Sequence, residues 1–278
     1  MSDVTAQLDD AVADVEIGLE GKTVRVTSLD RVLWPETATT KRDLLRYYVR
    51  VADRLLAWIR DRPLTLFRCP EGVAQKCWYQ TSCPHPPGWL RTATLPSAPG
   101  RRYCVIDDLA GLLWAGNRGT IELHRLQSTC GAAERPTHMV FDLDPEPGAG
   151  LQECAAVALL LRGRLSTRDA APVASGSRGL HIYVPMEEPT SYRDTKTLAR
   201  CLAEDLAREH PDLATVAPQK AKRLAPVYVD WVQNDINRSL VAPFSPRATP
   251  RPAAALPLTW DEVASLARGA LLETDWRR

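Results

Sequence analysis

Two aspartates, Asp142 and Asp144, are spaced so that they could hold metal ions. Residues 140–143 are apolar and partly β-branched, which predicts a buried strand, and Pro145 cannot donate to a ladder, so strand pairing should stop there. Because side chains alternate along a strand, both carboxylates should lie on one face, ~6–7 Å apart, close enough to share a pair of divalent ions. The alternative is a strand end that frays into a polar loop.

A loop of small residues at 174–179 leads into an apolar strand at 180–184. Small residues leave backbone N–H groups bare, and such groups can cradle phosphate oxygens. Ser175, Arg178 and His181 would converge on this loop, which suggests a seat for a triphosphate. The alternative is a glycine-rich hairpin turn.

Other residues that could do chemistry lie at the ends of apolar segments. Asp230 is at the polar end of a predicted strand at residues 227–231 and is followed by Gln233. His124 ends a short apolar segment, where a histidine is more often structural than catalytic.

Basic and aromatic residues occur together in the first third of the chain. Trp78 and Tyr79, with Arg68 nearby, suit base stacking if they are exposed, although Trp and Tyr are also ordinary core residues. Arginines recur at every fourth position of a predicted helix, which is typical of a solvated face but beside a DNA channel would bind phosphates. These are Arg42, Arg46, Arg50 and Arg54.

Charge is unevenly distributed along the 278 residues. The formal net charge is +1, but residues 1–20 hold six acids and no Lys or Arg. The rest of the chain therefore carries 35 basic against 28 acidic residues, a charge of +7, which permits binding to a polyanion. A hydrophobic content of 45% and a charged content of 25% are those of a globular protein with a sizeable core.

No apolar run approaches the ~18 residues of a membrane span, and the acidic start lacks the basic region of a signal peptide. We therefore expect a cytoplasmic protein without membrane contact. Seven cysteines are present, with no CxxC pair. A zinc site around Cys77, Cys83 and His85 would match no common zinc module, so we expect the reduced thiols of a cytosolic protein.

The elements that must position these residues follow an acidic tail at residues 1–14, which we expect to be mobile, with at most one helical turn around Leu8 and Val12. Alternating residues at 15–19 and 23–26 predict a hairpin. A helix should then begin at the N-cap Thr40, with Asp43 as the acid of its capping box.

Later in the chain, residues 61–100 are predicted to be irregular, residues 155–161 to form a buried helix, and residues 194–209 to form another. A last helix should begin after Thr259. The predicted inner stripe of the helix at 194–209 consists of Leu198, Cys201, Leu202 and Leu206.

Four short motifs occur in order along the chain. They read VFDLDP at 140–145, SGSRGLH at 175–181, VDWVQN at 229–234 and APFSPRA at 242–248. The set resembles the polymerase domain of bacterial ligase D, in the archaeo-eukaryotic primase superfamily. The stretch DRVLWP, the pair Thr40-Lys41 and the segment IELH are also similar to that family. The resemblance covers roughly residues 15–265, and without ligase or phosphoesterase modules it is closest to the stand-alone form.

The resemblance implies an α+β primase-polymerase fold over residues 15–278, with two interlaced α/β lobes and mixed or antiparallel sheets around a central active-site cleft. It implies Asp142, Asp144 and Asp230 as catalytic ligands of two divalent ions, Mn²⁺ or Mg²⁺. The residues that it implies for binding the incoming nucleotide are His124, Ser175, Arg178, His181, Arg223, Gln233 and Arg247.

A DNA-binding surface is also implied. Arg31 and Lys41 match the basic pair that grips the 5′-phosphate of a gap or broken end, and Trp78 and Tyr79 match aromatics that meet the template, beside Arg68. Such bacterial, nucleoid-associated enzymes extend primer 3′ ends with NTPs or dNTPs during non-homologous end joining or gap filling, and favour ribonucleotides. The implied partners are DNA with breaks or gaps, a Ku-type end-binding protein and a separate DNA ligase, with the polymerase a monomer.

Some positions depart from the family pattern. Phe67 and Thr81 stand where basic residues are common, Ala174 replaces a threonine, and Arg178 replaces a lysine but keeps its charge. A catalytically weak DNA-end or gap-binding module is therefore the alternative function, although the intact acids argue against it. A two-metal nuclease would need the same carboxylates but no triphosphate seat.

Overall fold

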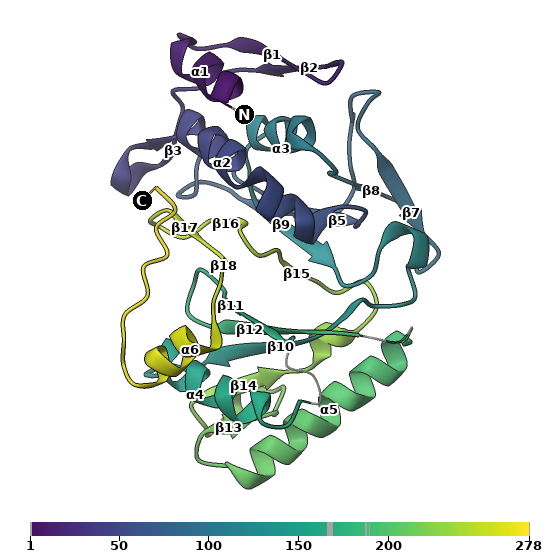
Figure 1. Ribbon diagram of the computed structural model, residues 1–278, viewed down its shortest axis with the longest axis vertical. Coiled ribbons are helices and arrows are strands. Elements are labelled where there is room, and N and C mark those ends of the chain that lie inside the picture. The colour runs from purple at the N-terminus through teal and green to yellow at the C-terminus, as the bar shows by residue number, and fades with distance from the viewer. Residues whose placement is uncertain (1, 166–168, 187, 189, 278) are drawn as a thin grey trace. The chain divides into compact units, whose positions relative to one another are not determined.

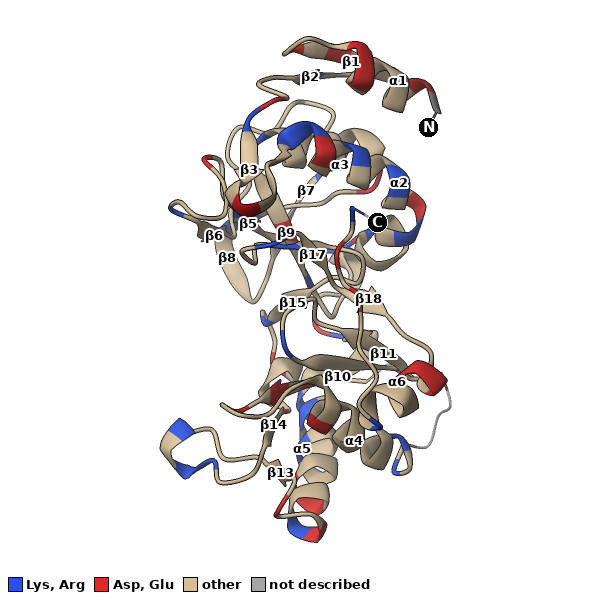
Figure 2. Ribbon diagram, turned by 90° about the vertical axis from the view of Figure 1, so that its left-hand side faces the viewer, with Lys and Arg blue, Asp and Glu red and all other residues tan. Residues whose placement is uncertain are grey.

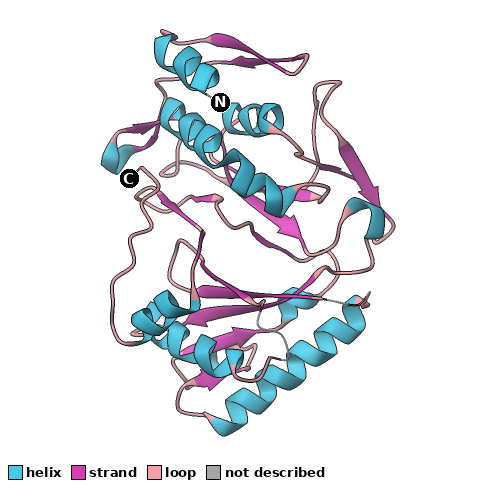
Figure 3. Ribbon diagram, viewed as in Figure 1, coloured by secondary structure: helices cyan, strands magenta, loops and turns pink. Residues whose placement is uncertain are grey.

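The computed structural model divides the chain into two compact units, each built from separate stretches of sequence (Figures 1 and 3). The structure describes residues 2–165, 169–186, 188 and 190–277. The first unit comprises Met1–Leu126, Val241–Ala254 and Thr274–Arg278, and the second comprises Gln127–Leu240 and Ala255–Glu273. The chain returns to each unit after leaving it, as expected for two interlaced lobes. Within the described part of the chain, none of the helices combines the length and apolar character that a membrane crossing requires.

The first unit combines helices with an antiparallel sheet in which β9, β5, β8 and β7 follow one another and β6 pairs with β5. Its helices are α1 (Ser2–Asp10), α2 (Lys41–Ile59) and α3 (Leu109–Asn117). Its strands are β1 (Val15–Leu19), β2 (Lys22–Val26), β3 (Val32–Trp34), β4 (Thr39–Thr40), β5 (Leu64–Arg68), β6 (Trp78–Gln80), β7 (Thr92–Leu95), β8 (Ala98–Cys104), β9 (Thr120–Leu126), β16 (Pro246–Arg247) and β17 (Ala253–Ala254). The predicted hairpin is confirmed as β1–β2.

Helix α2 has the predicted capping box. The Thr40 side chain accepts a hydrogen bond from the Asp43 N–H, and the Asp43 carboxylate accepts one from the Thr40 N–H at 2.8 Å. Because these bonds satisfy N–H groups that the helix cannot pair itself, they fix where α2 begins. The apolar stripe predicted for this helix is buried in the unit: Leu44, Leu45, Tyr48, Val51, Leu55, Leu56 and Ile59.

The acidic N-terminal segment forms a helix, not the mobile tail that we expected. Helix α1 buries Val4 and Leu8, which are 4% and 0% exposed. Its residues also meet the arginines of α2, since Arg42 donates to the Leu8 carbonyl and Arg46 pairs with Asp9. In Figure 2 the basic residues of α2 are blue and the acidic residues of the N-terminal segment are red. The expectation failed because the partners that order this segment lie far along the sequence.

The other two arginines of α2 also have partners in the first unit. Arg50 donates to the Trp276 carbonyl, and the Arg54 guanidinium lies 5.0 Å from the centre of the Phe244 ring. The arginine stripe therefore contributes to the packing of this unit.

Residues 61–100, which we expected to be irregular, contain β5, β6, β7 and the start of β8. These strands are short, and the partner of β5 is β9, which comes much later in the sequence. In that pairing Thr65 lies opposite His124 and Leu66 opposite Leu123. The prediction was wrong because β5 is ordered by pairing with the distant β9, and because the local hairpin of β7 with β8 was missed.

Four of the cysteines form disulfides, which corrects the expectation of reduced thiols. Cys69 is bonded to Cys77, at the end of β5 and the start of β6, and Cys83 is bonded to Cys104. Spacing along the chain could not reveal these pairs, because each forms when β5, β6 and β8 assemble.

The second unit is built on a sheet of order β13–β14–β10–β12–β11–β18, in which all pairs are antiparallel except β13 with β14. The strands are β10 (His138–Pro145), β11 (Ala171–Ala174), β12 (Leu180–Pro185), β13 (Ala214–Thr215), β14 (Val227–Asp230) and β18 (Leu256–Pro257), and β15 (Ser239–Val241) carries the chain back to the first unit. The helices are α4 (Leu151–Arg162), α5 (Tyr192–Glu209) and α6 (Trp260–Ala267), with a 3₁₀ turn, η4, at Val232–Asn234.

One face of this sheet packs on α4, α5 and α6 to form the core of the second unit (Figure 1). Phe141 and Leu143 of β10 lie in this core together with Ile182 of β12 and Val229 of β14. Since side chains alternate, the neighbouring residues of each strand point to the opposite face. That opposite face carries the acids.

The helices of the second unit confirm the predicted positions, and the predicted face of α5 only in part. Leu206 is buried and Leu202 packs against the core, whereas Leu198 is 47% exposed and Cys201 is exposed. The other buried residues of α5 include Thr195, Ala199 and Ala203. The stripe was misjudged because small residues, which allow close packing, were ranked below leucine.

Candidate active site

Asp142 lies in the middle of the second unit's sheet, on β10 between β14 and β12. It is directly opposite Asp230 on one side and His181 on the other. Residues that face each other across antiparallel strands project from the same side of a sheet. Asp142, Asp144, Asp230 and His181 therefore share the face opposite the apolar core, with His181 Nε2 3.4 Å from Asp142 Oδ1.

The pKa of Asp144 is raised above its usual value. Burial is the main cause and the nearby Asp230 charge is the second, while Arg223 and Arg178 lower the pKa in part. Positive charge close to such a carboxyl stabilises its ionised form. The environment of Asp144 therefore favours binding of a cation.

Arg223 is held beside this acidic face. Its Nη1 donates to Glu146 at 2.8 Å, its Nε donates to the Ala217 carbonyl at 2.9 Å, and its guanidinium lies 3.5 Å from the centre of the Tyr228 ring. Tyr228 is opposite Asp144 in the β10–β14 register. This places a fixed cation next to the strand that bears the acids.

Asp230 is oriented by the turn that follows it. Its Oδ1 accepts from the Val232 N–H at 2.9 Å, and its Oδ2 accepts from Gln233 Nε2 at 3.1 Å. Asn234 anchors the same turn to β10, because its side chain bonds both the N–H and the carbonyl of Val140, at 2.8 and 2.6 Å. The turn η4 thus fixes the position of one acid relative to the strand that carries the other two.

The small-residue loop joins β11 to β12 as a tight turn. The Ser175 Oγ accepts from the N–H groups of Ser177 and Gly179, both at 3.2 Å. These two N–H groups are therefore not bare, which corrects the expectation for this loop. Arg178 extends from the turn toward the end of β10, where its Nη2 is 3.5 Å from the Pro145 carbonyl.

The donors present suit a hard divalent ion. Among the described residues, no three His, Cys, Asp or Glu side chains converge closely enough to hold a metal, so ligation would require side-chain rotation. Asp142, Asp144 and Asp230 nevertheless supply carboxylate oxygens on one face, which Mg²⁺ and Mn²⁺ prefer. Burial first and the Asp230 charge second raise the pKa of Asp144, and a bound cation would offset both effects.

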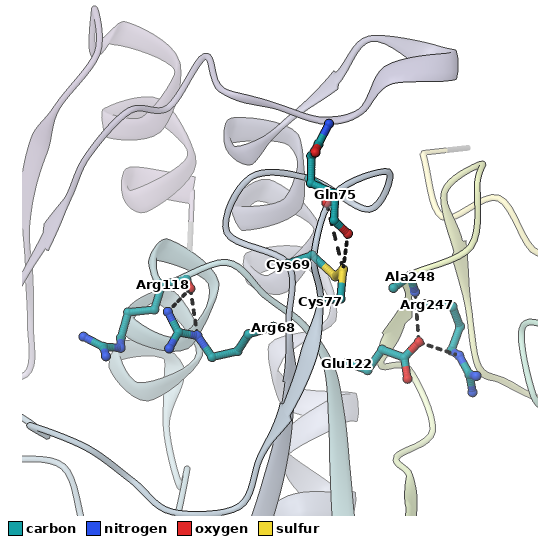
Figure 4. The surroundings of a disulfide bond; sticks show 9 residues. Arg68, Cys69, Gln75, Cys77, Arg118, Glu122, Arg247 and Ala248 are labelled. Atoms are coloured by element: carbon teal, nitrogen blue, oxygen red, sulfur yellow. Dashed lines mark hydrogen bonds and ion pairs between the residues drawn. A yellow bond between two sulfur atoms is a disulfide. The ribbon is translucent and has the colours of Figure 1, made fainter.

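A second group of predicted residues lies in the first unit, around the buried carboxylate of Glu122 on β9. His124 Nε2 is 2.7 Å from Glu122 Oε2, Arg247 Nε is 3.2 Å from Oε1, and the Ala248 N–H donates to Oε1 at 2.9 Å (Figure 4). The Tyr79 ring meets the His124 ring edge to face at 5.2 Å. The structure thus brings together His124, Arg247 and Tyr79, which lie far apart in sequence.

Arg68 holds the exposed aromatic pair in place. Its guanidinium donates to the Arg118 carbonyl and, at 2.6 Å, to Gln80 Oε1, and it lies 5.3 Å from the centre of the Trp78 ring. Trp78 and Tyr79 are 39% and 61% exposed, as base stacking would require. Arg68 itself is already engaged within the first unit.

Arg31 and Lys41 lie close together where α2 begins, but in different surroundings. Arg31 is exposed and pairs with Glu71 at 2.5 Å. Lys41 is 5% exposed, and its Nζ donates to the Thr27 carbonyl at 2.8 Å. Burial lowers the pKa of Lys41, and the Arg31 charge lowers it further. Two cations beside a helix N-terminus form a suitable site for an anion.

A family model described as LigD, primase-polymerase domain, matches residues 40–275. The chain belongs to this family. The multifunctional non-homologous end joining protein LigD of Mycolicibacterium smegmatis is 35% identical over 247 residues, 87% of this chain and 32% of that protein. The bifunctional non-homologous end joining protein LigD of Bacillus subtilis is 28% identical over 256 residues, 91% of this chain and 41% of that protein. The chain thus spans less than half the length of these curated relatives.

A solved structure gives the same result for the fold. The polymerase domain from Mycobacterium tuberculosis ligase D, solved in complex with DNA, is similar with a TM-score of 0.83 and 36% identity, over 91% of each chain. This confirms the α+β primase-polymerase fold. As a member of the LigD primase-polymerase family, the chain is a nucleotidyltransferase of that type.

Three residues that hold candidate site residues in place were not singled out from the sequence. Glu122 holds His124 and Arg247, Glu146 pairs with Arg223, and Asn234 ties η4 to β10. Glu122 and Asn234 lie inside segments that carry the resemblance, and their polar character within apolar strands or turns was the available signal. Their partners became visible only with the strand pairing.

Proposed function

We propose that this polymerase extends primer 3′ ends at breaks or short gaps in DNA, by two-metal catalysis and with a preference for ribonucleotides. The observation that carries the proposal is the acidic face of the second unit. Asp142 is opposite Asp230 there, and Asp144, two residues further along β10, lies on the same face. Arg223 and Arg178 border this face. Carboxylates with adjoining arginines suit transfer of a nucleotide, because the arginines neutralise charge that develops on phosphates.

Asp142, Asp144 and Asp230 would hold two Mn²⁺ or Mg²⁺ ions. Bound ions of this kind lower the pKa of an attacking hydroxyl and stabilise a leaving pyrophosphate. His181 is placed to orient Asp142, and Gln233 to orient Asp230. Ser175, Arg178, His181, Arg223 and Arg247 would bind the triphosphate, with His124 and Gln233 near the nucleotide.

DNA contacts are assigned to the first unit. Arg31 and Lys41 would bind the 5′-phosphate of a gap or end, and Trp78 and Tyr79 would stack on the template, with Arg68 supporting Trp78. We propose the same cellular process as the named relatives, non-homologous end joining, with a Ku-type protein and a DNA ligase as partners of a monomeric enzyme at the bacterial nucleoid, in the cytoplasm.

Primer extension on a gapped duplex bearing a 5′-phosphate tests this proposal. Each NTP and dNTP is supplied singly, with Mg²⁺ or with Mn²⁺, and with each template base. We expect template-directed addition that requires a divalent ion and is faster with NTPs. Tight gap binding without any addition would instead identify a DNA-end binding module, and shortening of the primer would identify a nuclease.

A further inference from the structure

Glu122 is a buried carboxylate with both oxygens engaged. It is 5% exposed and lies on β9, every residue of which is buried. One oxygen meets His124, and the other receives the Arg247 side chain and the Ala248 N–H. A carboxylate at such a position is costly unless it is paired and hydrogen-bonded. Here His124 and the Ala248 N–H are its hydrogen-bond partners, and Arg247 forms an ion pair with it.

The surroundings keep this carboxyl ionised. Burial by itself raises the pKa of Glu122, but the hydrogen bond from His124, the charges of Arg247 and His124, and the Ala248 N–H together lower it below its usual value. Because an ionised carboxylate can only accept hydrogen bonds, His124 Nε2 must carry the proton. Glu122 therefore fixes both the orientation and the protonated nitrogen of the His124 ring.

Glu122 also fixes Arg247. This arginine lies in the short strand β16, and the carboxylate receives its Nε while the outer end of the guanidinium lies farther from Glu122 (Figure 4). The Ala248 N–H, one residue on, is held by the same oxygen. The backbone before Arg247 is tied to β9 as well, because the Leu123 N–H donates to Ser245 Oγ at 2.9 Å.

The same cluster reaches the aromatic residues. Tyr79 contacts the His124 ring, and Phe67 contacts Tyr79 with ring centres 4.6 Å apart. Glu122 is opposite Phe67 in the pairing of β9 with β5. A continuous set of contacts therefore runs from the aromatic proposed for the template to the arginine proposed for the triphosphate, and Glu122 is at its centre.

We propose that Glu122 is a positioning residue for the incoming nucleotide, which holds His124 and Arg247 as one rigid group in fixed relation to Tyr79. The inference rests on the proposed function, because it gives His124 and Arg247 their nucleotide-binding roles. Glu122 itself makes no contact with substrate. Its effect is to order the two side chains before the nucleotide arrives, which reduces the entropy lost on binding.

Glu122→Gln is the direct test. Glutamine keeps the shape but offers one acceptor and one donor, so it cannot receive both His124 and Arg247. We expect the KM for the nucleotide to rise roughly tenfold or more, since hydrogen bonds between charged groups contribute a factor of about ten to a hundred. Affinity for gapped DNA, measured without nucleotide, should stay within about twofold, because the substitution leaves Tyr79 and the other side chains proposed to contact DNA unchanged. An unchanged KM overturns the inference.

Asp108→Asn is the matched control. Asp108 is another ion-paired carboxylate of the first unit, which pairs with Lys22 and accepts from the Gly111 N–H at 2.9 Å at the start of α3. Its loss should lower thermal stability and leave the KM for the nucleotide unchanged. If both variants raise KM equally, Glu122 has a structural role only and the inference is wrong.

The effects of two substitutions on kcat/KM, measured singly and together, give a test whose expected outcome a simple loss of stability would not produce. If Glu122 acts through Arg247 and His124, the loss of kcat/KM in the double variant Glu122→Gln/Arg247→Ala should be smaller than the product of the two single losses. If Glu122→Gln does not fold, His124→Ala and Arg247→Ala are combined instead, and the loss should be smaller than the product of the single losses. Losses that multiply in the measured pair overturn the inference. A wild-type enzyme without any extension activity would contradict the proposed function itself, whereas an active wild type with an unaltered Glu122→Gln would contradict this inference alone.

Discussion

At the scale of single residues, the positions of some acids follow from the alternation of side chains along a strand, and the positions of others depend on which strands pair. Asp142 and Asp144 share a face because they are two apart on β10. That Asp230 is opposite Asp142 depends on the β10–β14 register, which no local pattern encodes. No local pattern encodes the pairing of Glu122 either, because its partner Arg247 lies on β16, far along the sequence.

Lys41 provides a pH test of the proposed phosphate contact. Its pKa is lowered in the folded protein, by burial first and by Arg31 second, below the ~10.4 of an exposed lysine. Folding therefore favours the neutral amine, so stability should increase with pH between the lowered and the unfolded pKa, while the charge that binds phosphate is lost.

We expect the preference for gaps with a 5′-phosphate over gaps without one to fall as pH rises through this window. The ratio of the two dissociation constants, measured from neutral pH up to the ~10.4 at which an exposed lysine titrates, reports it. Lys41→Arg is the control, since arginine does not titrate there and its ratio should stay constant. A wild-type ratio that does not change with pH would remove Lys41 from the contact.

At the scale of elements, the sheet of the second unit places the glycine turn directly against β10. A Cβ on Gly179 would lie 2.3 Å from the Leu143 carbonyl oxygen, which a side chain cannot approach so closely. Only glycine therefore allows the turn that bears Ser175 and Arg178 to pack beside the acids.

Gly179→Ala should displace this turn. We expect a loss of roughly 1–3 kcal/mol in the free energy of unfolding, typical of overpacking, together with a higher KM for the nucleotide. Urea denaturation and steady-state kinetics measure the two effects. Gly163→Ala at the end of α4 is the control, because its nearest contact would be an ordinary 3.5 Å. Similar small effects from both substitutions would show that the turn tolerates a side chain.

Elements with a strong local signal were predicted well, and those ordered by distant partners were not. Helix α2 has both an apolar stripe and a capping box, and α6 has the capping box of Thr259 and Glu262. By contrast, β5 and β6 are short and depend on β9, and α1 is ordered by contacts with α2. Local periodicity contains no information about such partners.

At the scale of the whole molecule, a net charge of +1 conceals a basic body and an acidic N-terminal segment. One acid of that segment, Asp9, forms an ion pair with Arg46 of α2. Binding to a polyanion must therefore depend on particular cations and not on the overall charge. Arg31, which is exposed and paired with Glu71, is the cation proposed for the phosphate.

Arg31→Ala should weaken binding to gaps that bear a 5′-phosphate and leave binding to unphosphorylated gaps nearly unchanged. Loss of this contact should flatten the dependence of log K on log salt by ~0.9 for the phosphorylated gap. Fluorescence anisotropy over a range of salt concentrations measures both slopes. Arg25→Ala, which removes another exposed arginine of the same unit, should affect the two substrates equally. If Arg31→Ala also weakened binding to both substrates equally, Arg31 would contribute only general surface charge.

The central claim is that the acids of β10 and β14 carry out nucleotide transfer and do not hold the DNA. Asp142→Asn tests this most directly, because it removes one charge and leaves the shape of the side chain. Single-turnover extension and gap binding are measured on the same phosphorylated duplex with Mn²⁺ and an NTP. We predict that extension is abolished while the dissociation constant for the gap stays within about twofold of the wild-type value. Extension at the wild-type rate by Asp142→Asn would contradict the account.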